Sequence, residues 1–291
     1  MGTTDQLQAA LDTALARGAW TDEGLVVAGG IVDTRSANGF EWSTGDVNAV
    51  FELASVTKLL AAYACLMAVE EGVFELETPC GQEGSTVRHL LAHTSGAGFL
   101  TRQRQKAPGE RRIYSSAGFE ILGEALERET GMSFGEYARE GVFRPLGMES
   151  TEIYGSPGHE GRSTVADLGV FAREILSPKL LDPSTVREAM TPQFPDVRGV
   201  VPGYGMQKPC PWGLGFEIKG EKSPHWMGQV APPETVGHFG MSGTWFWAVP
   251  EWADSPAAGW AMVVLTNRMF GEWATELWPE TNTEVFRALG A

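Results

Sequence analysis

The residues from Glu52 to Glu71 most strongly constrain how this chain can fold. They begin Glu-Leu-Ala-Ser-Val-Thr-Lys and continue as a run rich in alanine, leucine and methionine, without glycine or proline, which predicts a helix. A short extended segment at residues 50–53 precedes the run, so Ser55 lies where strand gives way to helix. Lys58 follows three residues later, and side chains at that spacing share a helix face. We therefore expect a hydroxyl and an amine side by side at a helix N-terminus.

This pairing is one way to make a serine nucleophilic. The amine accepts the hydroxyl proton, and the backbone N–H groups of the first helical turn stabilise the oxyanion. The motif alone has little specificity, because the serine and lysine content of the 291 residues gives roughly 0.3 chance matches to S-x-x-K. An N-capping Ser55 with an exposed Lys58 is the alternative interpretation.

The order of the other predicted elements indicates two kinds of domain. Helices are expected at residues 5–17, 86–92, 118–131, 133–142, 163–176 and 182–190, and strands at residues 25–32, 39–45, 212–219, 235–239, 243–249 and 260–266. A last helix is expected at either 272–277 or 283–289, because Pro279 interrupts the pattern. The prolines between residues 192 and 211 predict a connector or surface loop. We therefore expect an α/β plus all-α protein, in which residues 1–72 and 205–291 form a discontinuous α/β domain, residues 73–204 form an inserted helical domain, and the active site lies at their interface.

Charge and cysteine content narrow the possible functions. The formal net charge is −15 and phosphate binding needs a basic patch, so nucleic acid is not an expected partner. The basic residues between Arg102 and Arg112 are interpreted as a solvated loop face. Three widely spaced cysteines imply no disulfide framework. If Met1 is the native start, the lack of an apolar leader or membrane span predicts a cytoplasmic protein without a membrane partner.

Several short motifs between residues 25 and 270 resemble, in the right order, those of the serine β-lactamase-like superfamily. The closest resemblance is to the branch of class C β-lactamases, low-molecular-weight DD-peptidases, D-aminopeptidases and family VIII-type esterases. Besides the Ser55 motif, the matching stretches are Leu90-Leu-Ala-His-Thr-Ser-Gly96, Tyr114-Ser-Ser116, Phe143-Arg-Pro-Leu-Gly-Met148, Ser163-Thr-Val-Ala-Asp-Leu168, Trp212-Gly-Leu-Gly-Phe216 and Gly237-His-Phe-Gly240. The resemblance implies a β-lactamase/transpeptidase-like fold, with an antiparallel sheet flanked by helices and an inserted helical domain. It also implies a serine hydrolase that forms an acyl-enzyme and needs no cofactor or metal.

The resemblance implies roles for individual residues. Ser55 would be the acylated nucleophile, and Lys58 would accept its proton or keep it polarised for another base. Tyr114 would be the second general acid or base, which requires that the pKa values of Lys58 and Tyr114 both be lowered. The backbone N–H groups of Ser55 and Met241, in the box that also holds Gly240, would form the oxyanion hole. The alternative for Tyr114 is a packed loop aromatic.

Two positions depart from the family pattern. Ser116 stands where an asparagine is usual, and a hydroxyl cannot donate and accept through separate atoms as an amide does. His238 stands where β-lactamases and DD-peptidases usually have a lysine, and a neutral imidazole offers one donor in place of a fixed cation. Both departures favour small neutral carboxylic esters over amides that carry a carboxylate. The alternative for His238 is a histidine in a strand whose hydrogen bonds are made within the protein and which has no catalytic role.

Three other functions stay open. The chain could be a β-lactam or D-amino-acid amide or peptide hydrolase, an acyltransferase of the same fold, or a catalytically impaired binding protein. The spacing of His89 and His93 lacks the glutamate of a zinc-binding helix, so no metal site is predicted. Six tryptophans either line an apolar acyl pocket or fill the core: 212, 226, 245, 247, 252 and 260. A small-molecule ester or amide is the expected partner, and the sequence does not predict the oligomeric state.

Overall fold

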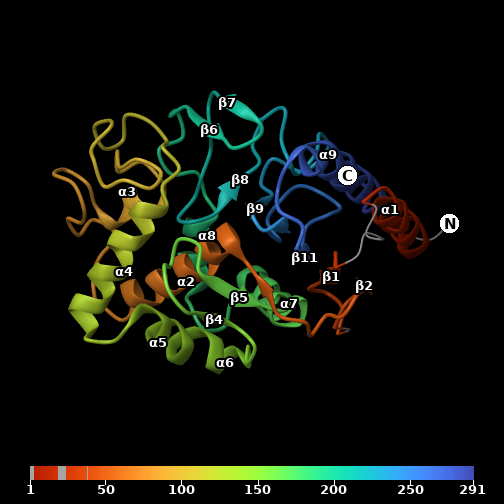
Figure 1. Cartoon of the computed structure of the whole chain (residues 1–291), viewed down its shortest axis with the longest axis horizontal. Coiled ribbons are helices and arrows are strands. Elements are labelled where there is room, and N and C mark those ends of the chain that lie inside the picture. The colour runs from red at the N-terminus through yellow and green to blue at the C-terminus, as the bar shows by residue number, and fades with distance from the viewer. Residues whose placement is uncertain (1–2, 19–23, 38) are drawn as a thin grey trace.

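A six-stranded antiparallel sheet lies at the centre of the computed structural model, which describes residues 3–18, 24–37 and 39–291. The strand order is β2-β1-β11-β10-β9-β8. The strands are β1 (Val27–Asp33), β2 (Trp42–Thr44), β8 (Glu217–Ile218), β9 (Val236–Gly240), β10 (Thr244–Ala248) and β11 (Trp260–Thr266). β1 pairs along its whole length with β11, so the sheet joins the two ends of the chain (Figure 1).

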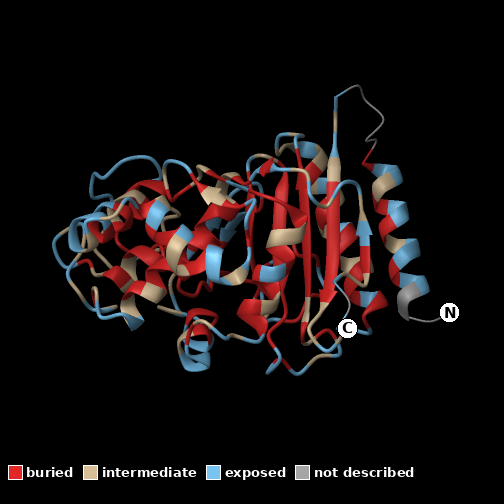
Figure 2. Cartoon of the chain, turned by 90° about the horizontal axis from the view of Figure 1, so that it is seen from below, coloured by how far each residue is buried: buried red, intermediate tan, exposed pale blue. Residues whose placement is uncertain are grey.

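Helices cover both faces of this sheet: α1 (Thr3–Arg17) and α9 (Glu272–Ala288) on one, α2 (Thr57–Glu70) and α7 (Val165–Leu176) on the other (Figure 1). The alternation of side chains along β10 serves both layers. Trp247 packs on Phe286 of α9, whereas its neighbour Phe246 contacts Phe171 of α7. The strands are therefore buried almost throughout, as Figure 2 shows.

The predicted helix that follows Ser55 is confirmed as α2. Eleven of its residues are buried, including Lys58, and a helix that is apolar all round belongs in the interior. It lies between the sheet and a group of shorter elements. These are α3 (Val87–Leu91), α4 (Ser116–Thr130), α5 (Phe134–Ala138), the π-helix η2 (Arg139–Phe143), α6 (Arg144–Leu146), α8 (Pro183–Ala189), the small sheet of β3 (Phe51–Glu52), β5 (Gly161–Ser163) and β4 (Glu152–Ile153), and the hairpin of β6 (Gly199–Val201) and β7 (Gly205–Gln207).

Two predictions for the middle of the chain were wrong. Residues 73–204 are not all-helical, because they contain the strands β4 to β6. The proline-rich stretch at residues 192–211 is not only a connector, since it forms the β6–β7 hairpin with Val200 opposite Met206. Pro202 and Pro209 lie just outside the paired positions, where a missing N–H removes no ladder hydrogen bond.

Two predictions for the last third were also wrong. Residues 212–219 are a strand only at Glu217–Ile218, because the chain first turns through Gly213 to Gly215, where Gly215 has a φ of 87°. The C-terminal helix is a single helix that contains Pro279. A proline removes one backbone hydrogen bond, and Trp278 and Phe286, on either side of it, are both buried in the same core, which favours a continuous helix.

The division of the chain at residues 73 and 204 stays a prediction. α7 lies inside the segment predicted as the helical domain, yet it packs against β1 and β11 of the central sheet. Within the described ranges, no helix is both long and apolar enough to cross a membrane.

Candidate active site

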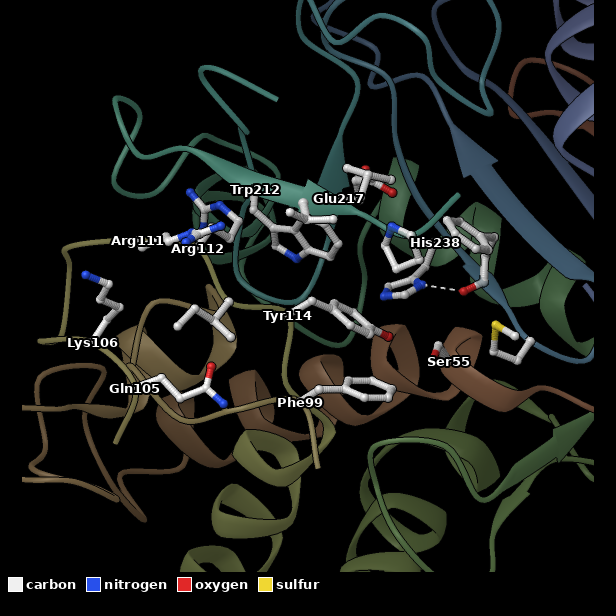
Figure 3. Close-up of a pocket in the computed structure, with 16 residues that line it drawn as sticks. Ser55, Phe99, Gln105, Lys106, Arg111, Arg112, Tyr114, Trp212, Glu217 and His238 are labelled. Carbon is white, nitrogen blue, oxygen red and sulfur yellow. Dashed lines mark hydrogen bonds between the residues drawn. The ribbon is translucent and has the colours of Figure 1, made fainter. Parts of the chain in front are cut away.

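A cavity of about 540 Å³ brings together residues that are far apart in the sequence. Four of the predicted site residues line it: Ser55, Tyr114, His238 and Met241 (Figure 3). The volume lies within the range of sites that bind small molecules. Of the other three predicted residues, Lys58 contacts Ser55, Ser116 contacts Lys58, and Gly240 lies against the turn that carries Ser55.

Ser55 lies in a tight turn between β3 and α2, the 3₁₀ helix η1 (Ala54–Val56). Ala54 has a φ of 46°, a left-handed conformation that is rare for residues other than glycine and that surrounding contacts must hold. Those contacts are on Leu53: its N–H donates to the Gly161 carbonyl at 2.9 Å, and its carbonyl accepts from Thr244 Oγ1 at 3.1 Å. The fold thereby fixes the turn in which Ser55 lines the cavity.

Gly240 allows the end of β9 to approach this turn. A Cβ atom at Gly240 would lie 2.3 Å from the carbonyl oxygen of Leu53, so any side chain would push the two segments apart. Met241 follows directly and lines the cavity. Among the described residues, neither the Ser55 N–H nor the Met241 N–H donates to a protein acceptor. Both donors are therefore available for the predicted oxyanion hole.

Lys58 is fully buried and makes three polar contacts. Its Nζ atom lies 3.4 Å from Ser55 Oγ, 3.1 Å from Ser116 Oγ and 2.5 Å from the carbonyl oxygen of Gly158. Burial lowers the pKa of Lys58 to about 7, although the carboxylate of Glu120 acts in the opposite direction. A neutral amine can donate to Ser116 and Gly158 and turn its lone pair to the Ser55 hydroxyl, as a general base requires.

Ser116, at the position of the usual asparagine, is the first residue of α4 and is buried. Its hydroxyl holds one side of the Lys58 amine, and Gly158 supplies a second acceptor that we did not predict. A Cβ atom at Gly158 would lie within 3.3 Å of Ser116, so glycine permits this close approach. No motif in the sequence marks Gly158, because it meets Lys58 only through tertiary contact.

Tyr114 lies beside Lys58, whose Nζ atom is 4.6 Å from the centre of the ring. Its hydroxyl is buried and makes no hydrogen bond within the described part of the chain. The prediction that the pKa of Tyr114 is lowered is wrong. Burial raises this pKa well above its usual range, and the nearby Ser55 hydroxyl, which by itself would lower it, has the smaller effect. Tyr114 is therefore a neutral phenol, suited to donate a proton.

His93 holds Tyr114 from both sides. Its carbonyl accepts from the N–H of Ile113 at 2.8 Å, and its Nδ1 atom accepts from the N–H of Ser115 at 3.1 Å. The two rings also pack together, with centres 4.7 Å apart. His89 instead contacts Thr86 and Phe194, so the two histidines have separate partners. The motif at residues 90–96 was the signal for this position, but we did not assign His93 to the site.

His238 is a neutral acceptor in this cavity. Burial lowers its pKa to about 3, and the positive charge of Lys58 acts in the same direction. Its Nδ1 atom lies 2.7 Å from the carbonyl oxygen of Phe239 and must donate to it, because a carbonyl only accepts. The Nε2 atom then carries no proton, and it has no hydrogen-bond partner among the described residues. The prediction of one donor for the substrate is therefore wrong: His238 offers an acceptor.

The tryptophans divide between the cavity and the core. Trp212 lines the cavity, whereas Trp226, Trp245 and Trp247 are buried in the core under α9. Trp252 and Trp260 are partly exposed, each beneath an arginine. The apolar wall of the cavity also includes Phe99, Ile113, Phe239 and Met241, and the β6–β7 hairpin adds residues 200–202.

A carboxylate also lines the cavity, but its charge is already balanced. Glu217 accepts from Lys222 and His225, each at 2.9 Å, and from Trp226 at 2.8 Å. Burial by itself would raise the pKa of Glu217, but Lys222, His225 and the hydrogen bonds of His225 and Trp226 outweigh it and hold the pKa below its usual range. Glu217 therefore stays ionised within a buried ion pair.

The basic loop is not simply a solvated face, which corrects the sequence-based interpretation. Lys106, Arg111 and Arg112 line the cavity. Arg112 is 3% exposed, and its guanidinium donates to four backbone carbonyls, those of Ala92, Gln193, Phe194 and Cys210. Burial lowers the pKa of Arg112 to about 10, so it remains a cation at neutral pH.

Comparisons with known proteins gave the following matches. The family model described as Beta-lactamase matches residues 15–282. A solved structure described as a β-lactamase from Mycobacterium bovis is 46% identical, with a TM-score of 0.88, and the match covers 96% of this chain and 100% of that chain. Penicillin-binding protein 4* of Bacillus subtilis is 28% identical over 140 residues, covering 37% of this chain and 31% of that protein. Esterase EstB of Burkholderia gladioli is 29% identical over 167 residues, covering 39% of this chain and 42% of that protein. The chain thus spans less than half the length of these two curated relatives.

Proposed function

The chain belongs to the Beta-lactamase family of serine hydrolases, and we propose that it hydrolyses carboxylic esters through an acyl-enzyme on Ser55. The contacts of Lys58 support the nucleophile assignment. A buried amine with a pKa of about 7 is neutral in about half of the molecules at pH 7, and its nearest hydroxyl in the cavity is that of Ser55. A neutral amine at this position can accept the proton of the Ser55 hydroxyl.

The first half of the reaction forms the acyl-enzyme. Ser55 Oγ attacks the ester carbonyl while its proton passes to Lys58 Nζ. The oxyanion accepts hydrogen bonds from the N–H groups of Ser55 and Met241. As the tetrahedral intermediate collapses, the leaving alkoxide takes the proton of Tyr114, and the Lys58 ammonium returns a proton to the phenolate. The alcohol leaves neutral, and Lys58 is again a free amine.

The second half releases the acid. Water attacks the acyl carbonyl and gives its proton to the oxygen of Tyr114 while the phenol passes its own proton to the neutral amine of Lys58. The same two N–H groups stabilise the oxyanion. The bond to Ser55 Oγ breaks, and the serine recovers its proton from Lys58. The same residues therefore serve both steps in reverse order.

The observation that favours esters is the chemical state of His238. An acceptor without a proton repels a carboxylate placed beside the scissile bond, where β-lactams and D-alanyl peptides carry one. Among the described residues that line the cavity near Ser55, no lysine or arginine side chain takes over that role. Phe99, Trp212 and Met241 supply an apolar surface suited to an acyl chain.

The decisive experiment compares wild type and Ser55→Ala on short p-nitrophenyl esters, following nitrophenol release and intact protein mass together. We expect turnover and a transient mass increase in wild type alone. The exposed Ser150→Ala is the matched control and should behave as wild type. Ester turnover retained in Ser55→Ala would overturn the proposal.

Other outcomes separate the alternatives. A trapped adduct without turnover would indicate an acyltransferase, whose acceptor is an alcohol or amine in place of water. Faster turnover of a chromogenic cephalosporin than of any ester would indicate a β-lactamase. Neither adduct nor turnover, on a broad set of esters and lactams, would favour a catalytically impaired binding protein.

A further inference from the structure

We propose that the cavity has a second recognition point, an anion subsite around Arg111, so that the preferred substrate carries a carboxylate or phosphate at the end remote from its ester bond. This inference rests on the proposed ester hydrolysis. It adds a substrate class to it, because neither the family match nor the catalytic residues say what the far end of the substrate is.

The subsite lies at the opposite end of the cavity from the nucleophile. Figure 3 shows Ser55 and His238 at one end and Arg111, Lys106 and Gln105 at the other, with Tyr114 and Phe99 between them. A substrate that reaches both ends must therefore be elongated. Its middle would pass the apolar walls, and its far end would meet cationic side chains.

The positive charges at this end are balanced only in part by the described residues. Lys106 forms an ion pair with Glu110 at 2.8 Å, whereas the two arginines have no carboxylate partner among those residues. Among the described residues, the guanidinium of Arg112 has only backbone carbonyls as hydrogen-bond partners. Arg111 is partly buried and forms no ion pair or side-chain hydrogen bond with the rest of the described chain. Glu217, the carboxylate in the lining, is neutralised by Lys222. The lining therefore has a cationic end in a protein whose net charge is −15.

An anion at this end would complete the site physically. A guanidinium that is partly removed from water binds carboxylate or phosphate more strongly than an exposed one, and its planar donors suit both groups. The cavity would then distinguish substrates by where they carry a negative charge: an anion is disfavoured beside His238 and favoured beside Arg111. Such a cavity would select a long ester with a terminal anion and reject a compact β-lactam whose carboxylate adjoins the scissile bond.

The test uses pairs of esters that differ only in the remote charge. On the acyl side, p-nitrophenyl hydrogen suberate is compared with p-nitrophenyl methyl suberate. On the alcohol side, the butyrate ester of ω-hydroxyoctanoic acid is compared with that of its methyl ester, by butyrate release. In at least one pair we expect the kcat/KM of wild type to be about 5- to 10-fold higher for the acid than for its methyl ester. This is the size of effect expected from one partly buried hydrogen bond between charged groups.

The matched variants are Arg111→Gln, Arg111→Lys and Arg104→Gln. Arg104 lies on the same loop, is exposed and does not line the cavity, so its loss changes the net charge equally. Arg111→Gln should abolish the preference for the acid, Arg111→Lys should keep part of it, and Arg104→Gln should keep all of it. The preference in wild type should also shrink as salt rises from about 0.02 M to about 0.5 M.

The two proposals fail in different ways. Ester turnover that survives Ser55→Ala would overturn the catalytic proposal. Turnover that depends on Ser55, but with the same acid-to-methyl-ester ratio in wild type and Arg111→Gln for both pairs, would overturn the anion subsite alone. An equal loss of preference in Arg104→Gln would also overturn it, because the effect would then come from net charge.

Discussion

The Nζ atom of Lys58 lies 2.5 Å from the carbonyl oxygen of Gly158, a residue 100 positions further along the chain. The contacts with Gly158 and Ser116 orient the amine, and its remaining polar contact is with the hydroxyl of Ser55. The glycine after Pro157 thus supplies an acceptor in a site whose usual asparagine is replaced by serine. Four predictions follow from this and neighbouring contacts.

Lys58 should determine the acid limb of the pH profile. The base must be unprotonated, and the pKa of Lys58 is lowered to about 7, so kcat/KM should rise with pH through about 7 and then level off. His238, with a pKa of about 3, stays neutral over this range and adds no step. The measurement is kcat/KM of wild type from about pH 5 to about pH 9. A flat profile, or an acidic optimum, would contradict Lys58 as the base.

Replacing Lys58 by methionine should inactivate the protein and stabilise it. In the folded protein the pKa falls from 10.5 to about 7, so the unfolded chain binds a proton that the fold excludes, and stability rises with pH between these values. Such a shift corresponds to roughly 5 kcal/mol, and the loss of the contacts with Ser116 and Gly158 offsets part of it. We expect a net gain of roughly 2 kcal/mol in the free energy of unfolding.

The gain from Lys58→Met should be larger at pH 6 than at pH 9. Below the folded pKa of about 7 the protein must bury the charged ammonium, whereas at pH 9 the buried amine is neutral and the remaining cost is that of deprotonating it. Denaturant unfolding at both pH values measures this difference. A variant that is less stable than wild type at pH 6 would show that the amine's hydrogen bonds outweigh its desolvation.

His93 should act as a positioning residue for Tyr114. His93→Ala removes the acceptor for the Ser115 N–H. It also places an alanine, whose side chain forms no hydrogen bond, at a backbone φ of 57°. We expect kcat to fall by about 10- to 100-fold. His93→Asn keeps an acceptor near the Nδ1 position and tolerates this φ, so it should recover part of the loss. Equal activity of the two variants would contradict a role that depends on this hydrogen bond.

Gly240→Ala should separate the oxyanion donors. The new Cβ would lie 2.3 Å from the carbonyl oxygen of Leu53, so the end of β9 must move away from the turn that carries Ser55. We expect a loss of about 100-fold or more in kcat/KM. Gly141→Ala is the control, because its Cβ would meet only Met67 at 3.7 Å. If Gly240→Ala keeps wild-type kcat/KM, then Met241 N–H does not hold the oxyanion.

The stretch from Glu52 to Glu71 determined much of this outcome by itself. Alanine and leucine without interruption specify a helix, and the S-x-x-K spacing is short enough for helical geometry to bring Ser55 and Lys58 together. The collinear motifs placed Tyr114, Ser116 and His238 in the same site. Such features could be predicted because they depend on local spacing or on a family pattern.

Only the tertiary structure decided how these groups are ionised and what surrounds them. Burial raises the pKa of Tyr114 and lowers that of Lys58, and burial depends on how distant segments pack. The tautomer of His238 follows from the position of the Phe239 carbonyl. Arg111, on a loop that was predicted to be solvated, lines the cavity because the fold brings this loop together with residues 200–202 and Trp212. Local sequence does not encode these properties, because each arises from contacts between residues that are far apart in the chain.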